Sequence, residues 1–313
     1  MSKMKEIPFI KGHMGGNEIV LVNRRHFSTT EELSNSLSIL RKPNVRGDQL
    51  GLLYEGTGRG KLGAKIVDIN SGDYLPMCGG LTQVLGKAYV QLDLVDTLGL
   101  TTSSGQSTLT LETKLGVFQI RVGAPGGPRE VLTEMNPFVE DVYNRGIRQV
   151  SVGGATGYFA GDFLVGLLSE LRGTYDSIDL KPIDDKSRRA LIDFQRGFSK
   201  AYLRGKPNRD FVVVDVTSDR SDGRLLFPHN LEEGLTEPSC GTGTVAAVAA
   251  LLHGGLIERE GAFRLEFESG GRGDSIGGPD RTVVAGEIKD GKLVDSWLAH
   301  DNVKALASGL LYL

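Results

Sequence analysis

Cysteine and histidine are scarce in this chain of 313 residues. It contains two cysteines, Cys78 and Cys240, and five histidines. The cysteines are 162 positions apart (240 minus 78) and the histidines show no metal-ligand spacing, which argues against a zinc site. The sequence therefore predicts no bound metal.

Long apolar runs and a large excess of one charge are absent as well. No apolar segment approaches the length of a membrane span, and residues 1–6 lack the apolar core of a signal peptide. A net charge of −3 gives no electrostatic reason to bind nucleic acid or an anionic membrane. We expect a cytoplasmic protein with neither of these partners. Cytoplasmic thiols stay reduced, so a structural disulfide is disfavoured.

Glycine, in contrast, is abundant: its 43 copies cluster in tight turns between short apolar runs. This composition suits antiparallel strands with sharp connections, where positive φ angles are needed. Apolar patterning predicts strands at residues 18–22, 64–69, 108–113, 116–122, 149–152, 211–216, 264–268 and 282–288. Helices are predicted at residues 30–40 and 186–202 and directly after each cysteine. The order of strands, buried helix and strands occurs twice, which indicates the α+β class.

The length allows two domains. A proline- and glycine-rich interruption at residues 123–129 is the candidate boundary. The strand after it can still belong to the first half, so we place the switch near residue 134. The predicted domains are 1–133, which carries Cys78, and 134–292, which carries Cys240. Residues 293–313 are candidates to return to the first domain, because two half-sites that face each other need crossing connections.

Both cysteines stand before a glycine turn and an apolar run that reads as a helix. Cys78 is followed by Gly79 and Gly80, and Cys240 by a Gly-Thr-Gly sequence. The unpaired N–H groups and partial positive charge of a helix N-terminus favour a thiolate and bind an anion beside it. We therefore expect two thiols with modestly lowered pKa values, arranged as a duplicated half-site.

Two opposed thiols can act as an acid and a base on one small molecule. A thiolate removes a proton from one face of a carbon, and a thiol delivers a proton to the other face. The result is inversion at that carbon or proton transfer along a conjugated system. The N–H groups of the helix entrances would bind a carboxylate and stabilise the charge that builds on it. The sequence therefore predicts a small carboxylate substrate, and this chemistry requires no cofactor.

Four segments of the chain resemble one known family. Residues 238–244 read Pro-Ser-Cys-Gly-Thr-Gly-Thr, residues 71–79 contain Pro-Met-Cys-Gly, residues 13–18 read His-Met-Gly-Gly-Asn-Glu, and residues 152–155 contain Gly-Gly. They are similar, respectively, to the second cysteine motif, the first cysteine motif, the opening segment and the Gly-Gly segment of the diaminopimelate epimerase and proline racemase superfamily. These racemases and epimerases work without pyridoxal phosphate. The Gly-Gly segment resembles the proline racemase branch.

The resemblance implies two similar domains, each a barrel-like sheet around a central helix, with the active site in the cleft between them. It implies that Cys78 and Cys240 form the acid–base pair and that a homodimer is plausible. The substrate-binding residues that it implies are Gly79, Gly80, Gly241 and Thr242, which would bind a carboxylate, together with Asn17, Glu237 and His13.

The chain departs from the family pattern at three places. Gly80 occupies the position where an Asn or His is usual, which removes a side chain beside the first thiol. Glu237 lies one position away from the acidic residue that proline racemases carry before the second cysteine. Residues 232–234 read Glu-Glu-Gly where diaminopimelate epimerases have Glu-Arg-Gly. Proline and diaminopimelate are therefore both disfavoured as the specific substrate.

Three functions remain open from the sequence. The first is a cofactor-independent racemase or epimerase that inverts the α-carbon of an amino acid. The second is an isomerase of an unsaturated di- or tricarboxylate, which uses the same proton transfer to move a double bond or change its geometry. The third is a non-catalytic small-molecule binding protein that has kept the fold.

Overall fold

The computed structural model describes residues 5–58, 61–100, 107–123, 130–175, 178, 184–206, 208, 210–217, 221–230, 235–269 and 280–313. These residues form two compact units. Unit 1 is Met1–Pro137 with Ala299–Leu313, and unit 2 is Phe138–Leu298. Each unit combines a mixed β-sheet with helices, so the predicted α+β class is confirmed.

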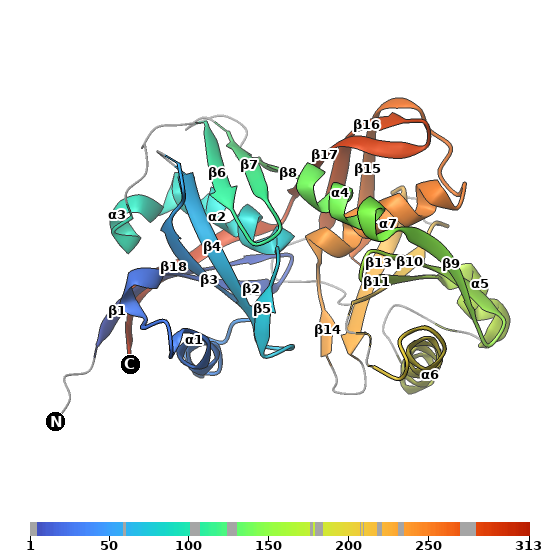
Figure 1. Cartoon of the computed structure of the whole chain (residues 1–313), viewed down its shortest axis with the longest axis horizontal. Coiled ribbons are helices and arrows are strands. Elements are labelled where there is room, and N and C mark those ends of the chain that lie inside the picture. Colours follow the sequence, from blue (N-terminus) through green and yellow to red (C-terminus); the bar gives the residue numbers. More distant parts are fainter. Residues whose placement is uncertain are drawn as a thin grey trace. The chain divides into compact units, whose positions relative to one another are not determined.

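Unit 1 is a mixed sheet curved around helix α2 (Gly79–Gln91). Its strands are β1 (Glu6–Met14), β2 (Asn17–Asn23), β3 (Gln49–Glu55), β4 (Lys61–Asp68), β5 (Asp73–Leu75), β6 (Thr108–Glu112), β7 (Val117–Val122), β8 (Val131–Glu134) and β18 (Val303–Tyr312). Helix α2 contacts β1 and β18 and also β7 and β8 (Figure 1). The sheet therefore surrounds the helix rather than covering one side of it.

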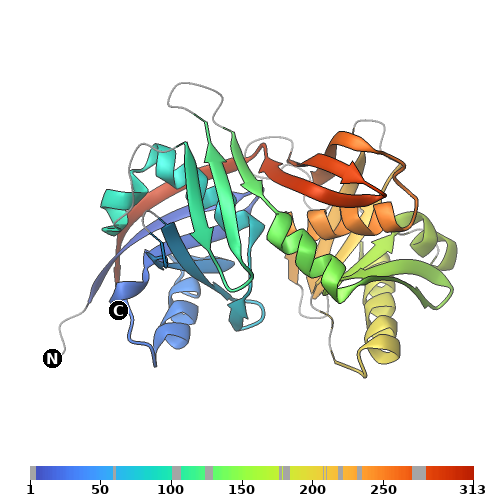
Figure 2. The same ribbon diagram turned by 45° about the horizontal axis from the view of Figure 1, so that its top comes forward.

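Unit 2 has the same plan around helix α7 (Gly241–His253). Its strands are β9 (Ile147–Val152), β10 (Ala155–Ala160), β11 (Phe163–Leu167), β12 (Phe211–Asp215), β13 (Gly223–Asn230), β14 (Leu235–Glu237), β15 (Gly261–Ser269), β16 (Arg281–Lys289) and β17 (Lys292–His300), whose last two residues belong to unit 1. Helix α7 lies between β16 and strands β10 to β12 (Figure 2).

The two units repeat one order of strand pairing. In unit 1, β1 pairs antiparallel with β2, β2 runs parallel to β3, and β4 pairs antiparallel with β3 and β5. Strand β4 is also parallel to β6, which pairs antiparallel with β7. Strands β10 to β16 of unit 2 follow this scheme pair for pair. Each central helix follows the fifth strand of its repeat, so Cys78 and Cys240 occupy equivalent positions.

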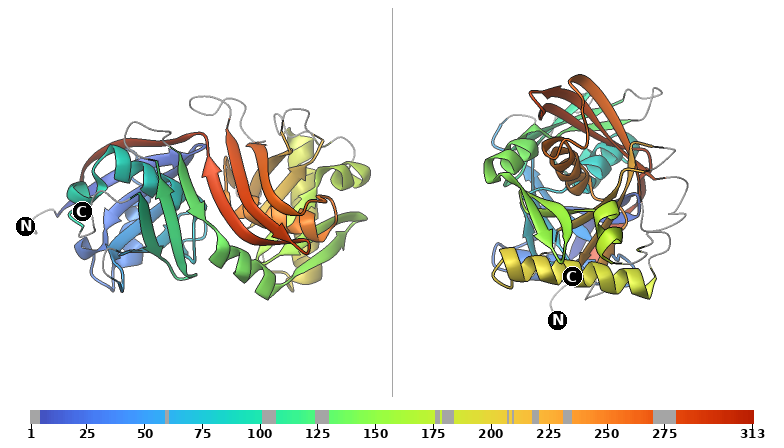
Figure 3. Two further views of the ribbon diagram at one scale, coloured as in Figure 1. Left: turned by 90° about the horizontal axis from the view of Figure 1, so that it is seen from above. Right: turned by 90° about the vertical axis from the view of Figure 1, so that its right-hand side faces the viewer.

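The other helices surround these central ones. They are η1 (Arg24–His26), α1 (Glu32–Leu40), α3 (Leu94–Leu98), α4 (Asn136–Arg145), α5 (Leu168–Thr174) and α6 (Asp185–Tyr202). Of them, α3 joins the core around α2 through Leu94 and Leu98. In unit 1, α1 covers the outer sheet face through a second apolar cluster that contains Ile39 and Leu50. In unit 2, α6 covers β9 to β12 through Phe194 and Phe198, on the side away from α7 (Figure 3). Among the described residues, no helix has the length and apolar character needed to cross a membrane.

Candidate functional site

Each cysteine is the N-cap of the central helix of its unit. Cys78 precedes α2 and Cys240 precedes α7, both with extended backbone angles (φ −142°, ψ 117° and φ −134°, ψ 112°). Both side chains are largely buried, with exposed fractions of 7% and 9%. The predicted helix entrances are therefore confirmed. The first N–H groups of each helix have no intrahelical acceptor, so they can bind an anion beside the thiol.

In unit 1, the first thiol and the side chain of Asn17 both adjoin Gly80. The N–H of Leu81 donates a hydrogen bond to Cys78 Sγ at 3.4 Å. A Cβ built on Gly80 would lie 3.7 Å from Cys78 Sγ and 3.6 Å from Asn17 Nδ2, both ordinary van der Waals distances. The space beside this thiol therefore adjoins the Asn17 amide, and glycine is not required by packing.

A two-residue hairpin turn places Asn17 there. Met14 on β1 pairs with Asn17 on β2, and Gly15 and Gly16 between them have φ values of 56° and 91°. Two consecutive positive φ angles are typical of the turn that joins tightly connected strands. The predicted opening segment is therefore this turn, and Asn17, which is 1% exposed, begins the strand that follows it.

His13 stabilises the same turn from β1. Its Nδ1 accepts a hydrogen bond from the N–H of Gly16 at 3.2 Å, and its side chain is buried. Burial lowers the pKa of His13, and the charge of Lys304 lowers it further. We therefore interpret His13 as a neutral imidazole with a structural role in the turn that carries Asn17.

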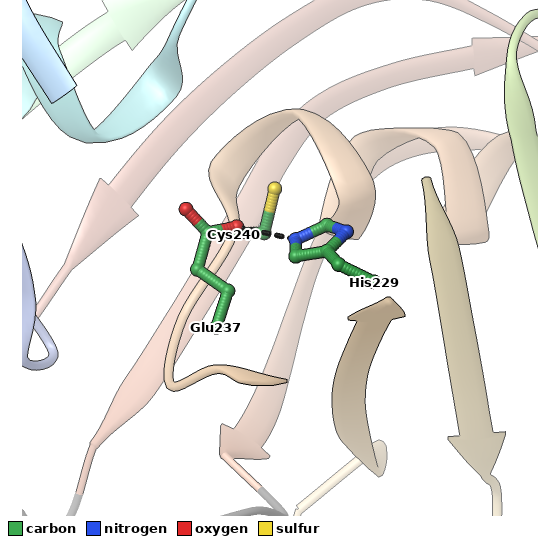
Figure 4. Close-up of side chains that lie close together, drawn as sticks. All are labelled: His229, Glu237 and Cys240. Carbon is green, nitrogen blue, oxygen red and sulfur yellow. Dashed lines mark hydrogen bonds and ion pairs between the residues drawn. The ribbon is translucent and has the colours of Figure 1, made fainter. Parts of the chain in front are cut away.

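In unit 2, the second thiol lies within a cluster of polar side chains. Cys240 Sγ is 3.4 Å from the hydroxyl of Thr242, in the first turn of α7. Glu237, the last residue of β14, has a side chain that is 9% exposed, and its carboxylate lies 2.6 Å from His229 Nε2 on β13. The side chains of Glu237 and His229 converge on the thiol (Figure 4). Glu237 is therefore a buried strand residue rather than a solvated loop acid.

The predicted lowering of the thiol pKa is wrong for Cys240. Burial raises the pKa of this thiol well above its usual value, and the negative charge of Glu237 raises it further. Hydrogen bonds from the Thr242 hydroxyl and the Gly243 N–H act in the opposite direction but do not outweigh these two effects. Cys240 is therefore a protonated thiol at neutral pH, because burial destabilises its thiolate more than the helix N-terminus stabilises it.

His229 is the residue that the sequence did not single out. Eight positions separate it from Glu237, and the contact depends on the antiparallel pairing of β13 with β14. Donor atoms of His229, Glu237 and Cys240 all lie within 4.8 Å of one another. Among the described residues of unit 2, these three could hold a metal ion. The feature of the sequence that could have indicated His229 is a histidine and an acid on two neighbouring strands.

The remaining predicted features are the Gly-Gly segment, the segments outside the described residues and the distribution of the site residues over the two units. Gly153 and Gly154 form the two-residue turn between β9 and β10, with φ values of 62° and 96°, and so act as a strand-end bend. Residues 232–234 and most of the glycine- and proline-rich segment 123–129 lie outside the described residues. Cys78, Gly79, Gly80, Asn17 and His13 belong to unit 1, whereas Glu237, Cys240, Gly241 and Thr242 belong to unit 2.

No family model matches the sequence, and no curated protein sequence matches it. Solved structures do match the fold. A hydroxyproline epimerase from Agrobacterium vitis with bound trans-4-hydroxy-L-proline superposes with a TM-score of 0.62 at 12% identity, covering 100% of this chain and 93% of that one. Methylitaconate-delta-isomerase has a TM-score of 0.61 at 14% identity, with coverages of 100% and 96%.

A phenazine biosynthesis protein of the PhzF family from Bacillus anthracis matches with a TM-score of 0.58 at 11% identity, covering 99% of this chain and 100% of that one. Identities this low establish the fold alone. The chain therefore has the fold shared by these epimerase, isomerase and PhzF-family structures, as the two cysteine motifs predicted.

Proposed function

We propose that the protein is a cofactor-independent isomerase that moves a proton at a carbon next to a carboxylate, with amino-acid racemisation or epimerisation as the favoured reaction. The observation that carries the proposal is the repeat: two thiols, each the N-cap of an enclosed helix, at equivalent points of two units with one pairing order. A pair of structural cysteines would not require this equivalence, whereas a two-base reaction does.

The two thiols have different resting roles in this proposal. Cys240, which burial and Glu237 keep protonated, is the acid that delivers a proton to the substrate carbon. Cys78, whose Sγ accepts the Leu81 N–H at the helix entrance, is the base that removes a proton from the opposite face. In one turnover the substrate loses one proton to Cys78 and gains one from Cys240. This leaves Cys78 as the thiol and Cys240 as the thiolate. The reverse reaction uses the opposite assignment.

The helix entrances stabilise the intermediate. Removal of the proton leaves negative charge that spreads onto the substrate carboxylate. The N–H groups of Gly79 and Gly80, or of Gly241 and Thr242, would hold that carboxylate and stabilise the developing charge. In this proposal Asn17 adds a side-chain amide next to Gly80. The small volume at Gly80 would admit a substrate group where related proteins carry a side chain.

A second candidate is an isomerase of an unsaturated di- or tricarboxylate. The observation that favours it is the contact of Glu237 Oε2 with His229 at 2.6 Å. A carboxylate already engaged by an imidazole is a weaker partner for a substrate ammonium group. The similarity of the fold to methylitaconate-delta-isomerase supports this candidate as well as the similarity to the hydroxyproline epimerase supports the first.

Proton exchange in deuterated water separates these functions. We expect one or more members of an L-amino-acid panel to gain deuterium at the α-carbon, and mass spectrometry measures this exchange. Both Cys78→Ser and Cys240→Ser should lose it. Turnover of an aconitate-like substrate without α-exchange of any amino acid would favour the second candidate. If neither class reacts and both variants bind carboxylates as the wild type does, the protein is a binding module.

A further inference from the structure

The cluster of His229, Glu237 and Cys240 presents an imidazole nitrogen, a carboxylate oxygen and a sulfur within 4.8 Å of one another (Figure 4). All three side chains are buried and come from different elements of unit 2: β13, β14 and the entrance of α7. This mixture of donors matches the ligands of a borderline-soft divalent ion such as Zn²⁺. Mg²⁺ and Ca²⁺ prefer sites made of oxygen ligands and do not fit a thiolate.

The distances allow a metal after small side-chain movements. Tetrahedral zinc with its usual bond lengths places its ligand atoms about 3.3–3.6 Å apart. His229 Nε2 and Glu237 Oε2, now 2.6 Å apart and hydrogen-bonded, would separate by somewhat less than about 1 Å as the metal replaces the shared proton. Three protein ligands leave a fourth position for water, the arrangement of an accessible rather than a closed zinc site.

The supporting contacts hold these groups in place. The ring of His229 stacks on Phe227 of the same strand, with centroids 6.3 Å apart, and Gln195 Nε2 donates to the His229 carbonyl at 2.5 Å. Ser269 donates a hydrogen bond to the carbonyl of Pro238, between Glu237 and Cys240. Preorganisation of this kind reduces the entropy that a metal must overcome on binding.

The charges also balance. A thiolate and a carboxylate supply two negative charges to a divalent cation, and the imidazole binds as a neutral ligand. Binding forms a metal–sulfur bond and a metal–nitrogen bond. The thiol proton is released to water, and the proton on His229 Nε2 leaves that nitrogen through exchange with water, so that the neutral ring carries its proton on Nδ1. No oxidant, reductant or further reactant is required.

We propose that His229, Glu237 and Cys240 form a binding site for Zn²⁺, which occupies the second thiol and blocks its proton transfer. The binding site stands on the geometry of unit 2, whereas the block of proton transfer rests on the proposed function. Zinc would then be a reversible inhibitor that competes with the substrate for Cys240, and its removal by a chelator would restore activity.

Co²⁺ provides a spectroscopic probe that needs no substrate. Anaerobic titration of the reduced full-length protein should give a thiolate-to-cobalt charge-transfer band and the visible bands of a tetrahedral ion, saturating at about one ion per chain. Zn²⁺ should displace the Co²⁺. Cys240→Ser should lose the charge-transfer band, and His229→Ala and Glu237→Gln should each weaken Co²⁺ binding about tenfold or more.

Two variants serve as matched controls. Cys78→Ser removes the other thiol, and His253→Ala removes an exposed histidine at the end of the same helix α7. Both should bind Co²⁺ as the wild type does. The proposal is overturned if the band depends on Cys78, if His229→Ala binds Co²⁺ with unchanged affinity, or if no charge-transfer band forms.

A measurement on the wild-type protein covers the case in which a variant does not fold. One equivalent of Zn²⁺ should slow the alkylation of Cys240 by iodoacetamide about tenfold or more, as measured by peptide mapping. Alkylation of Cys78 in the same sample should keep its rate. Equal rates at Cys240 with and without Zn²⁺ would refute the site, whatever the activity assay shows.

Discussion

The Glu237 carboxylate lies 2.6 Å from His229 Nε2, and its charge raises the pKa of the neighbouring Cys240 thiol. The carboxylate thus contacts the imidazole and the neighbourhood of the thiol at once. It shares a hydrogen bond with the imidazole, and its charge disfavours a thiolate three residues further along the chain. This relationship gives the second cysteine a resting state that the helix entrance alone would not produce.

Replacement of Glu237 should therefore make Cys240 more reactive. Burial and Glu237 both keep the thiol protonated, so its alkylation should be slow at pH 8 and rise as the pH increases above 9. Glu237→Gln removes the negative charge and lowers the pKa of Cys240 towards its usual value. We expect the iodoacetamide rate at Cys240 to rise about threefold or more at pH 8.

Thr242→Val is the matched control, because the Thr242 hydroxyl lowers the pKa of the same thiol. This variant should be alkylated more slowly than the wild type at every pH below the thiol pKa. An equal or slower rate in Glu237→Gln would contradict the role given to the carboxylate.

Gly80 and Gly86 of helix α2 should respond oppositely to alanine. A Cβ at Gly80 meets only ordinary contacts of 3.6–3.7 Å, whereas one at Gly86 would lie 2.6 Å from Val131 Cγ1. Gly80→Ala should leave the free energy of unfolding unchanged or raise it by up to about 1 kcal/mol, since alanine favours the helix. Gly86→Ala should lower it by about 1–3 kcal/mol. Urea denaturation measures both.

The same Gly80→Ala variant tests the proposed site. Its new methyl group occupies the space beside Cys78 Sγ and Asn17 Nδ2, so substrate turnover should fall although stability does not. If turnover is unchanged while the fold is intact, the space at Gly80 is not part of the substrate site.

His300 should make the folded protein sensitive to acid. Burial, together with the charge of the nearby His13, lowers the pKa of this side chain to about 3. In the unfolded chain a histidine takes up its proton near pH 6.5. The stabilisation from neutral His300 is therefore complete above about pH 6.5 and is lost as the pH falls from there towards 3.

His300→Gln should show a shallower loss of stability over this range. Urea midpoints at pH 7.5, 6, 5 and 4 give the slope, and His253→Gln, an exposed histidine, should keep the wild-type slope. Identical slopes for His300→Gln and the wild type would show that His300 does not couple folding to pH.

The local sequence was sufficient to predict the structure where glycine determines the backbone conformation. The glycines after Cys78 and Cys240 allowed both helix entrances to be predicted, and Gly15–Gly16 is a turn because both residues need a positive φ. The contact of His229 with Glu237 was missed because it depends on pairing between two strands. The pKa of Cys240 was misjudged because burial, its largest cause, arises from packing that no motif reveals.

The two-base mechanism requires Cys78 and Cys240 to reach one carbon, and oxidation tests this requirement directly. A disulfide forms only when the Cα atoms of its cysteines come within about 7 Å. Mild oxidation of the substrate-free protein should join the two thiols within one chain, giving a cross-linked peptide pair that a reductant separates. A bound carboxylate should protect against the cross-link, and Cys78→Ser should remain a reduced monomer under the same conditions. If both thiols are alkylated readily yet no intramolecular cross-link forms with or without ligand, the cysteines do not share a substrate and the two-base proposal is wrong.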